Sequence, residues 1–365
     1  MSQPVAITDR NDASSQIKQS WGRAGRNYPV NCWWVAAGAD EVAEKPLSRW
    51  LLDQRVVLYR RRDGSVAALE DRCPHRWAPL SQGRLADDVL TCRYHGFQFD
   101  AGGVCVHVPT QGHIPGSLSV RTYPIAERGG YVWIWMGEPA NADHALLPDV
   151  AWFERPSNLR FSGSMEVACN YMLIQENVLD LTHFGHLHAD TLAQTGWENP
   201  SMDVRVERNT VTYEQRFNDV ALAPFQALPM QLEIGKHVDR VDWGTFLSPA
   251  AHVAGIDVTD PRPGADGRTS YAFRIMHLTT PIAPDRTHYW WAVSQDYGQH
   301  DPEVASATRN IIEVTFDQDK DVLESIQDTV NRSYQGGQAN EVSVTSDQPG
   351  LQARRILQAM LARES

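Results

Sequence analysis

The chain has 365 residues, of which 42% are hydrophobic and 21% charged, and its formal net charge at pH 7 is −12. This composition is typical of globular proteins, and the length favours two domains. The negative charge argues against nucleic acid or an anionic membrane as a partner, because both would repel an acidic protein. The five cysteines do not form a dense disulfide framework, and the sequence contains neither a long apolar run nor a signal peptide. We therefore expect a cytoplasmic protein without a membrane span.

The first part of the chain predicts a terminal arm followed by an all-β domain. Residues 1–26 are polar and mixed in charge, which is typical of a weakly ordered segment. Residues 27–140 alternate short apolar runs with turn signals, the pattern of a domain built from short strands. Glycine, proline and asparagine between residues 137 and 148 mark the predicted boundary with a second domain, residues 141–365.

The second domain predicts mixed secondary structure. We expect a helix near residues 170–190, strands between about 203 and 295, and a long helix over 303–334, where apolar residues recur at helical spacing. A short terminal helix is expected over 354–361. The predicted fold class is therefore α+β, with an all-β domain first and an antiparallel sheet covered by helices second.

Two short motifs in the first domain each combine one cysteine with one histidine. They read Cys73-Pro-His75 and Cys92-Arg-Tyr-His95, with sixteen residues between them. Zinc sites use such ligands but usually space them as Cys-x-x-Cys and His-x-x-x-His. A Rieske [2Fe–2S] centre needs two cysteines on one iron and two histidines on the other, so each motif must reach both irons. The alternation of Cys and His favours this cluster, and structural zinc is the alternative.

A second metal pattern lies in the helical segment of the second domain, where Asp180, His183 and His188 occur within nine residues. Non-haem iron oxygenases bind Fe(II) through two histidines and one carboxylate. A spacing of five on a regular helix separates two side chains by about 140°, so the helix must end or bulge between the histidines. Gly185 is a reasonable place for this break, and His186 is a rival ligand. The alternative interpretation is a group of surface histidines at a helix end.

These motifs together resemble the oxygenase component of Rieske non-haem iron oxygenases, over about residues 28–360. The branch of vanillate O-demethylase and dicamba monooxygenase is the most similar. The resemblance implies that the first motif pair holds a [2Fe–2S] cluster and that His183 and His188 bind a mononuclear Fe(II). The segments that carry it are 31–37, 93–96, 176–183 and 319–324.

The resemblance also implies a third iron ligand from distant sequence. In this branch the ligand is the middle acid of a Glu-Asp-Lys pattern, which maps to Asp319. Gln318 departs from the pattern, and Asp321 adds an alternative acid. On a helix Asp317 and Asp321 share a face from which Asp319 is turned by about 160°, so only one face can meet the iron. We expect Asp319 to be the ligand.

The same resemblance implies a homotrimer in which the cluster of one subunit serves the iron of its neighbour. Asp180 would bridge the two centres, hydrogen-bonded to His183 of its own chain and to His95 of the partner subunit. Such a carboxylate can orient both imidazoles. Asn177 is a candidate residue of the iron site, with a helix-terminal hydrogen bond as the alternative, and His277 is a candidate substrate contact or a core histidine.

The activity implied is O2 activation with electrons from NAD(P)H. No Rossmann glycine pattern or flavin site is evident, so a separate reductase or ferredoxin must deliver the electrons. The branch implies oxidative O-demethylation of a small methoxylated aromatic acid. Alternatives on the same iron are ring hydroxylation, N-dealkylation and methyl hydroxylation. An electron-transfer protein of Rieske type and a zinc-stapled binding module are alternatives from other classes.

Overall fold

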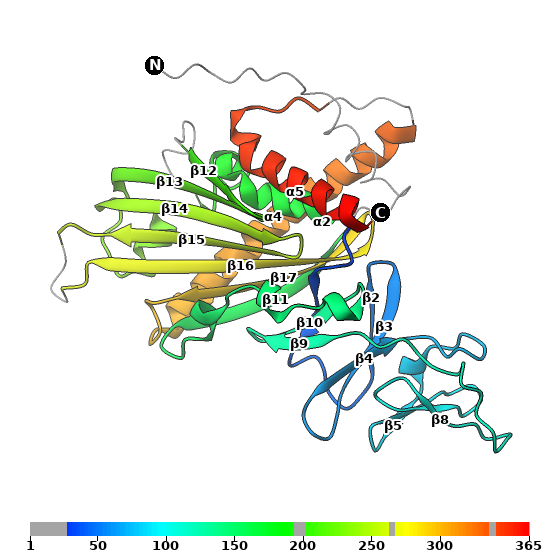
Figure 1. Ribbon diagram of the computed structural model, residues 1–365. Coiled ribbons are helices and arrows are strands. Elements are labelled where there is room, and N and C mark those ends of the chain that lie inside the picture. Colours follow the sequence, from blue (N-terminus) through cyan, green and yellow to red (C-terminus); the bar gives the residue numbers. More distant parts are fainter. Residues whose placement is uncertain (1–27, 193–201, 263–266, 336–340, 365) are drawn as a thin grey trace. The chain divides into compact units, whose positions relative to one another are not determined.

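The computed structural model describes residues 28–192, 202–262, 267–335 and 341–364 (Figure 1). The predicted arm, residues 1–26, lies outside the described residues. The chain divides into two compact units. The smaller unit contains residues 30–150 with 280–283, and the larger contains residues 151–279 and the chain from residue 284 onward. No helix in the described part of the chain is long and apolar enough to span a membrane.

The smaller unit is built from three small antiparallel sheets. Strand β10 reads Tyr-Val-Trp-Ile-Trp and is buried along its whole length, so it forms the centre of the first sheet, as its run of aromatic and β-branched residues predicts. The three sheets have the orders β1-β10-β9, β2-β3-β4 and β5-β6-β7-β8. Their strands are β1 (Trp33–Gly38), β2 (Leu47–Leu51), β3 (Gln54–Arg60), β4 (Val66–Glu70), β5 (Arg84–Ala86), β6 (Val89–Thr91), β7 (Gln98–Phe99), β8 (Cys105–His107), β9 (Ile125–Arg128) and β10 (Tyr131–Trp135).

A hydrophobic core joins the second and third sheets of this unit. Val57 and Leu69 contribute from the second sheet, and Leu90 and Phe99 from the third. Short 3₁₀ helices complete the connections. They are η1 (Leu80–Gln82), η2 (Pro139–Asn141), η3 (His144–Leu146) and, at the start of the larger unit, η4 (Ala151–Glu154).

The larger unit is organised around a seven-stranded antiparallel sheet of order β11-β17-β16-β15-β14-β13-β12 (Figure 1). Burial alternates along β13 and β14, because successive side chains of a strand point to opposite faces. The strands are β11 (Leu159–Val167), β12 (Met202–Glu207), β13 (Thr210–Ala221), β14 (His237–Ser248), β15 (Ala251–Thr259), β16 (Ser270–Ala283) and β17 (Arg286–Gln295).

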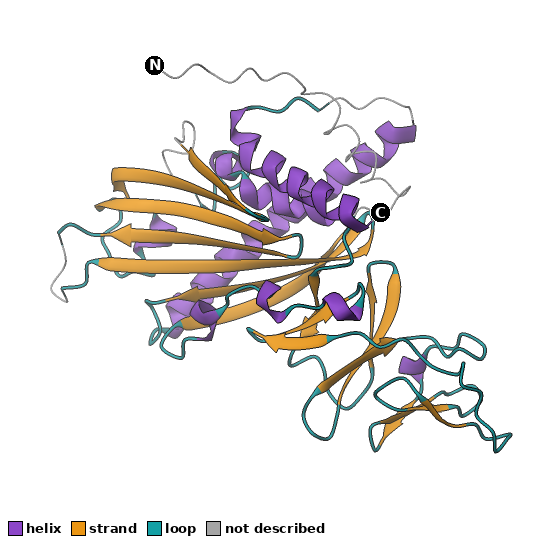
Figure 2. Ribbon diagram, in the orientation of Figure 1, coloured by secondary structure: helices purple, strands orange, loops and turns teal. Residues whose placement is uncertain are grey.

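Three helices of the larger unit pack against this sheet, namely α2 (Tyr171–Leu179), α4 (Pro302–Gln335) and α5 (Gln348–Glu364) (Figure 2). The shorter helical elements are η5 (Leu181–Gly185), α3 (Pro224–Ala227) and η6 (Thr345–Asp347). The predicted long helix agrees with α4 to within one residue at each end, whereas the terminal helix is longer than the predicted 354–361.

The predicted helix over 170–190 is wrong in its extent. Helix α2 ends at Leu179, because Asp180 adopts an extended conformation with φ −129° and ψ 100°. The chain then forms a 3₁₀ turn, η5, in which the Asp180 carboxylate caps the Thr182 amide. The α-helix therefore ends before His183, earlier than expected, and η5 ends at Gly185, between the two histidines as their spacing requires.

Candidate active site

Two loops that begin at Cys73 and Cys92 have the same hydrogen-bond pattern. In each loop the cysteine carbonyl accepts a hydrogen bond from the amide four residues later, 2.8 Å from Trp77 and 3.0 Å from Gly96. The cysteine amide in turn donates to the carbonyl five residues later, at 2.9 Å and 2.7 Å. The residue that closes each turn has a left-handed backbone, with φ 61° at Trp77 and 74° at Gly96. The two motifs are therefore structural repeats of one another.

These loops bring two thiols and two imidazoles together. The rings of His75 and His95 lie with their centroids 4.5 Å apart, and His75 stacks on Phe97 at 4.7 Å. Cys73 and Cys92 are both buried in the core, and burial, with the neighbouring Cys92 thiol, raises the pKa of Cys73 to about 11. All five cysteines are free thiols.

The donor set of the loops fits a metal cluster. The Nδ1 atom of His75 is buried without a hydrogen-bond partner, which is costly unless the atom binds something else. Two thiolates and two imidazoles on paired loops are the ligands of a Rieske [2Fe–2S] centre.

A second group of ligand atoms lies in the larger unit. His183, His188 and Asp319 each offer one atom, and these atoms lie within 4.8 Å of one another. Asp319 Oδ1 is 3.2 Å from His188 Nε2 and 3.6 Å from His183 Nε2. His188 is fully buried, and its Nε2 makes no hydrogen bond. Two imidazoles and one carboxylate around a buried, unpartnered nitrogen fit a mononuclear metal site.

Hydrogen bonds fix the tautomer of both histidines. His183 Nδ1 lies 2.6 Å from the carbonyl oxygen of Asp180, and His188 Nδ1 lies 2.8 Å from Oε1 of Gln318. A carbonyl oxygen only accepts, so each Nδ1 carries the proton and each Nε2 keeps its lone pair toward Asp319. Burial lowers the pKa of His183, with Asp319 opposing the shift, which keeps this ring neutral.

Helix α2 is fixed to its neighbours at both ends. The Asn170 side chain caps the helix by accepting from the Met172 amide at 2.9 Å, and the backbone amide of Asn170 donates to Oε1 of Gln327 in α4 at 2.8 Å. At the other end, the Val178 carbonyl accepts from the Tyr213 hydroxyl of β13 at 3.1 Å. These contacts hold α2 and α4 together where the ligand atoms meet.

The helix pair places Asn177 beside the ligand group. Its Nδ2 donates to Asp319 Oδ1 at 3.0 Å and lies 3.5 Å from His183 Nε2. The rival residues are not in the group, because His186 and Asp321 are exposed. The structure thus brings together Asn177, His183, His188 and Asp319 and excludes the rivals.

Comparison with known proteins identifies both units. Residues 32–124 match the Rieske [2Fe–2S] domain, and residues 167–363 match the vanillate O-demethylase oxygenase C-terminal domain. The chain belongs to the vanillate O-demethylase oxygenase family. It is the oxygenase component of a Rieske monooxygenase system and an oxidoreductase, as the sequence predicts.

Relatives in this Rieske oxygenase family cover nearly the whole chain. The vanillate O-demethylase oxygenase subunit of Pseudomonas sp. (strain HR199 / DSM 7063) is 31% identical over 92% of this chain and 96% of its own. The dicamba O-demethylase oxygenase component of Stenotrophomonas maltophilia is 34% identical over 81% of this chain and 87% of its own. The crystal structure of dicamba monooxygenase bound to 3,6-dichlorosalicylic acid superposes with a TM-score of 0.85 at 32% identity, covering 92% of this chain and 99% of that chain.

One contact expected from the family differs in this oxygenase. The Asp180 carboxylate does not bond to His183 but accepts from the Thr182 amide at 2.9 Å, and the backbone carbonyl of Asp180 contacts the imidazole instead. The reason is the helix break, because a residue that caps η5 must turn its carboxylate toward the first free amides. Asp180 therefore positions His183 through its backbone.

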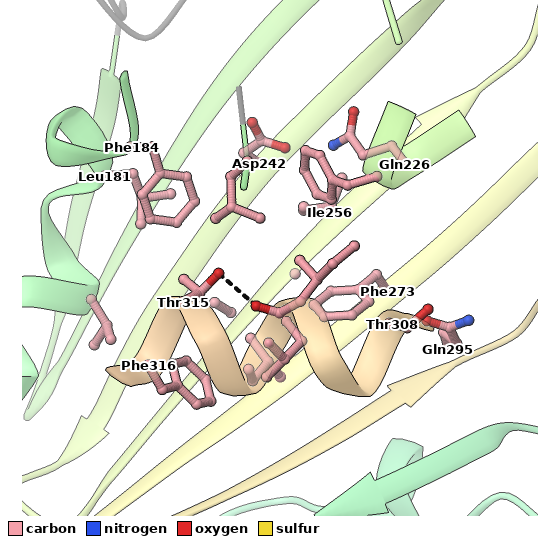
Figure 3. A pocket seen from close by; sticks show the side chains of 18 of the residues that line it. Leu181, Phe184, Gln226, Asp242, Ile256, Phe273, Gln295, Thr308, Thr315 and Phe316 are labelled. Atoms are coloured by element: carbon pink, nitrogen blue, oxygen red, sulfur yellow. Dashed lines mark hydrogen bonds between the residues drawn. The ribbon is translucent and has the colours of Figure 1, made fainter. Parts of the chain in front are cut away.

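An apolar cavity opens from the metal-ligand group, between helix α4 and the sheet (Figure 3). Phe184, Phe273, Ile275 and Phe316 contribute much of its wall. His277 also lines it, with Nδ1 2.7 Å from the Tyr289 hydroxyl, and burial lowers the pKa of His277 to about 4. The candidate substrate contact is thus at the cavity and is also a hydrogen-bonded core histidine.

The sequence reasoning missed several polar residues of this region. Gln318, which orients His188, was noted only as a departure from the family pattern. Five polar residues that line the cavity carried no motif: Gln226, Asp242, Gln295, Thr308 and Thr315. The one available signal was Gln295, a glutamine at the end of a strand whose central residues, 289–293, are aromatic or apolar.

Proposed function

We propose that His183, His188 and Asp319 bind a mononuclear Fe(II) and that this oxygenase O-demethylates a small methoxylated aromatic compound. The observation that carries the proposal is the pair of neutral imidazoles and one carboxylate at the wall of an apolar cavity. Two histidines and one carboxylate on one face of an iron leave coordination positions open for O2 and substrate. The relatives that support the substrate class are O-demethylases of vanillate and dicamba, and a related structure is of dicamba monooxygenase with non-haem iron.

In this proposal the [2Fe–2S] cluster is held by Cys73, His75, Cys92 and His95. It receives electrons that originate from NAD(P)H and are delivered by a separate reductase or ferredoxin. When bound, the mononuclear iron supplies O2-dependent oxidation of the methyl group. One oxygen atom enters the methoxy carbon and the other leaves as water, with two electrons and two protons consumed. The resulting hemiacetal breaks its C–O bond to release formaldehyde and a phenol.

The protein's own residues prepare this chemistry. The Asp180 carbonyl and Gln318 hold the two Nδ1 protons, so both Nε2 atoms face the site with lone pairs. The Asn177 amide donates to Asp319 Oδ1 and orients this carboxylate. The apolar walls exclude water and hold an aromatic ring.

We further propose a homotrimer in which Asp180 links the iron site to His95 of the partner subunit. The position of Asp180 supports this proposal. The residue lies between helix α2 and the turn that carries His183, and it also lines a small polar pocket with Glu176 and Arg354. Its backbone serves His183, and its carboxylate caps η5 through one oxygen, which leaves acceptor capacity on the carboxylate.

The native electron donor is not needed for the first test. The cluster is reduced with dithionite, excess reductant is removed, and a methoxybenzene panel and air are added to the anaerobic protein. We expect formaldehyde and the matching phenol in one turnover, and no formaldehyde from the double variant His183→Ala, His188→Ala. Formation of phenol from the ring C–H, without formaldehyde, would favour ring hydroxylation. Cluster reduction without any product would favour an electron-transfer protein.

A further inference from the structure

The described residues that line the substrate cavity offer no positively charged side chain to match an anionic ligand. None of its lining residues in the described part of the chain is a lysine or an arginine, while Asp242 and Asp319 both line it. Arg240 on the same strand is buried, and its Nε donates to Asp242 Oδ2 at 3.0 Å, so its charge is already matched. Asp242 is paired in the same contact, and Asp319 is a proposed ligand of the iron, so the proposed cation lies at the Asp319 end of the cavity. A substrate carboxylate at the opposite end would lose its hydration without gaining a cation.

Three neutral side chains of the cavity have polar atoms without hydrogen-bond partners. They are Gln295 with Oε1, Thr308 with Oγ1, and Gln226 with both Oε1 and Nε2. Gln295 is fully buried and Thr308 is 8% exposed. Buried polar groups are almost always hydrogen-bonded, so these atoms indicate missing partners. Gln295 and Thr308 lie near each other, because Gly298 is close to the Gln295 amide and to Val304, one helical turn before Thr308. Figure 3 shows both at the end of the cavity away from Phe316.

The orientation of the Gln295 amide determines what the partner must be. Its Nε2 donates to the Tyr297 carbonyl at 3.1 Å. Reversing the amide would place two acceptors against each other, so Oε1 is the atom that stays free. An acceptor needs an N–H or O–H donor, which a carboxylate does not offer at neutral pH. The Thr308 hydroxyl can donate or accept and so suits either half of an amide.

Helix α4 gives the distance between this polar end and the metal-ligand group. Thr308 and Asp319 both face the cavity from α4 and are eleven residues apart, which is about 16 Å along the helix axis. A ligand whose methoxy group lies near Asp319 therefore presents the opposite end of its ring toward Gln295 and Thr308.

We propose that Gln295 and Thr308 form a subsite for a neutral hydrogen-bond donor on the substrate, a carboxamide or a hydroxyl group, and that the enzyme discriminates against aromatic carboxylates. The inference rests on the proposed function, because it takes the cavity as the substrate site. It departs from the aromatic acid that the family resemblance implies.

The first test compares three ligands of one shape. The dissociation constants of 4-methoxybenzamide, 4-methoxybenzoate and 4-methylanisole are measured by isothermal titration calorimetry on the anaerobic, metal-loaded protein at pH 7.5. We expect the amide to bind at least about 10-fold more tightly than the carboxylate, since one buried hydrogen bond and one unmatched charge separate them. Equal or tighter binding of the carboxylate would overturn the inference.

The second test uses variants with a matched control on the same helix face. Gln295→Leu and Thr308→Val should each weaken amide binding by about 10-fold and leave the affinity for 4-methylanisole unchanged, and Thr308→Ser should restore the amide affinity. Thr315→Val is the control, because the Thr315 hydroxyl lines the same cavity but already donates to the Ile311 carbonyl at 2.8 Å. It should leave amide binding unchanged.

The outcomes separate this inference from the proposed function. If Gln295→Leu and Thr308→Val both bind the amide as the wild type does, ordered water satisfies these groups and the subsite is wrong. If the carboxylate and the amide bind alike and both release formaldehyde, the subsite is wrong while the proposed function stands. If no ligand binds and no methoxybenzene releases formaldehyde, both are wrong. The wild-type ligand series remains decisive where a variant does not fold.

Discussion

The two proposed metal-binding regions of this oxygenase are assembled over different lengths of sequence. The cluster loops lie within one stretch of the Rieske domain, and each loop closes through hydrogen bonds between its own backbone groups. The proposed mononuclear site joins α2 and η5 to α4, so that Asn177 contacts Asp319 across 142 positions of sequence. The first site therefore depends on two local turns, and the second depends on the packing of helices against a sheet.

The two regions also differ in exposure. His95 of the cluster loops is exposed, whereas His188 is fully buried behind the cavity. An electron-transfer centre needs an approach for its redox partner, and an oxygen-activating centre needs protection from water. A substitution in the cluster loops should therefore disturb the cluster alone. A substitution near His183, His188 and Asp319 should act by moving these ligand side chains.

The largest effect is expected from Cys73→Ser. It should abolish the visible absorption of the cluster and all turnover, while the mononuclear iron, assayed by metal analysis, remains. Cys105→Ser is the matched control, because Cys105 is a buried free cysteine of the same core outside the loops. A cluster spectrum retained in Cys73→Ser would contradict the ligand assignment.

Next in size is Asp319→Asn, which should lower turnover by more than about 100-fold with the cluster spectrum unchanged, since it removes a carboxylate ligand. The control is Asp321→Asn, which changes an exposed acid on the same helix and should retain most of the activity. Single-turnover formaldehyde release measures both. The opposite ranking would move the ligand to Asp321.

Asp180→Asn tests whether the two regions communicate through this residue. The backbone carbonyl that holds His183 is unchanged, so both metal centres should stay occupied. Cluster reoxidation on adding substrate and O2 should nevertheless slow by more than about 100-fold, beyond the 10–100-fold typical of residues that only support a ligand. Normal reoxidation, or a fully active monomer in solution, argues against the proposed bridge.

A smaller loss is expected from Gln318→Leu, which removes the acceptor for His188 Nδ1. Iron affinity, measured by competition with a chelator, should fall by about 10- to 100-fold. Gln318→Glu keeps the acceptor and should retain tight binding. Unchanged affinity in the leucine variant would show that burial alone fixes the His188 ring.

The smallest expected effect belongs to the cluster loops. Gly96→Ala should lower the free energy of unfolding by about 1 kcal/mol, since a left-handed backbone disfavours a side chain. The added Cβ would also lie 3.0 Å from Pro109 Cγ. Gly116→Ala is the control, because its Cβ would meet nothing within 4 Å. Denaturant unfolding of the cluster-loaded protein gives the free energy of unfolding of each variant. Equal losses of stability in the two variants would contradict backbone strain at Gly96.

The predictions from sequence succeeded where a pattern is local. Alternating Cys and His residues predicted the cluster loops, and helical periodicity predicted α4 to within one residue at each end. The spacing of His183 and His188 required the helix to end between them, and η5 ends there, at Gly185, but the spacing did not predict the earlier end of α2 at Leu179. That earlier end goes with the Asp180 carboxylate capping the next turn, which helical spacing does not reveal.

The sequence by itself determined the family and the order of the two domains, because both follow from short-range spacing of residues. The ligand types of the two metal sites stay predictions from the same spacing. Only the tertiary structure decided that Asp319 and not Asp321 meets the histidines, that Gln318 holds His188, and that Gln295 and Thr308 lie in one cavity. These relations join strands and helices distant in sequence. They follow from which face of α4 packs on the sheet, and that is decided by the burial of a whole surface and not by any one motif.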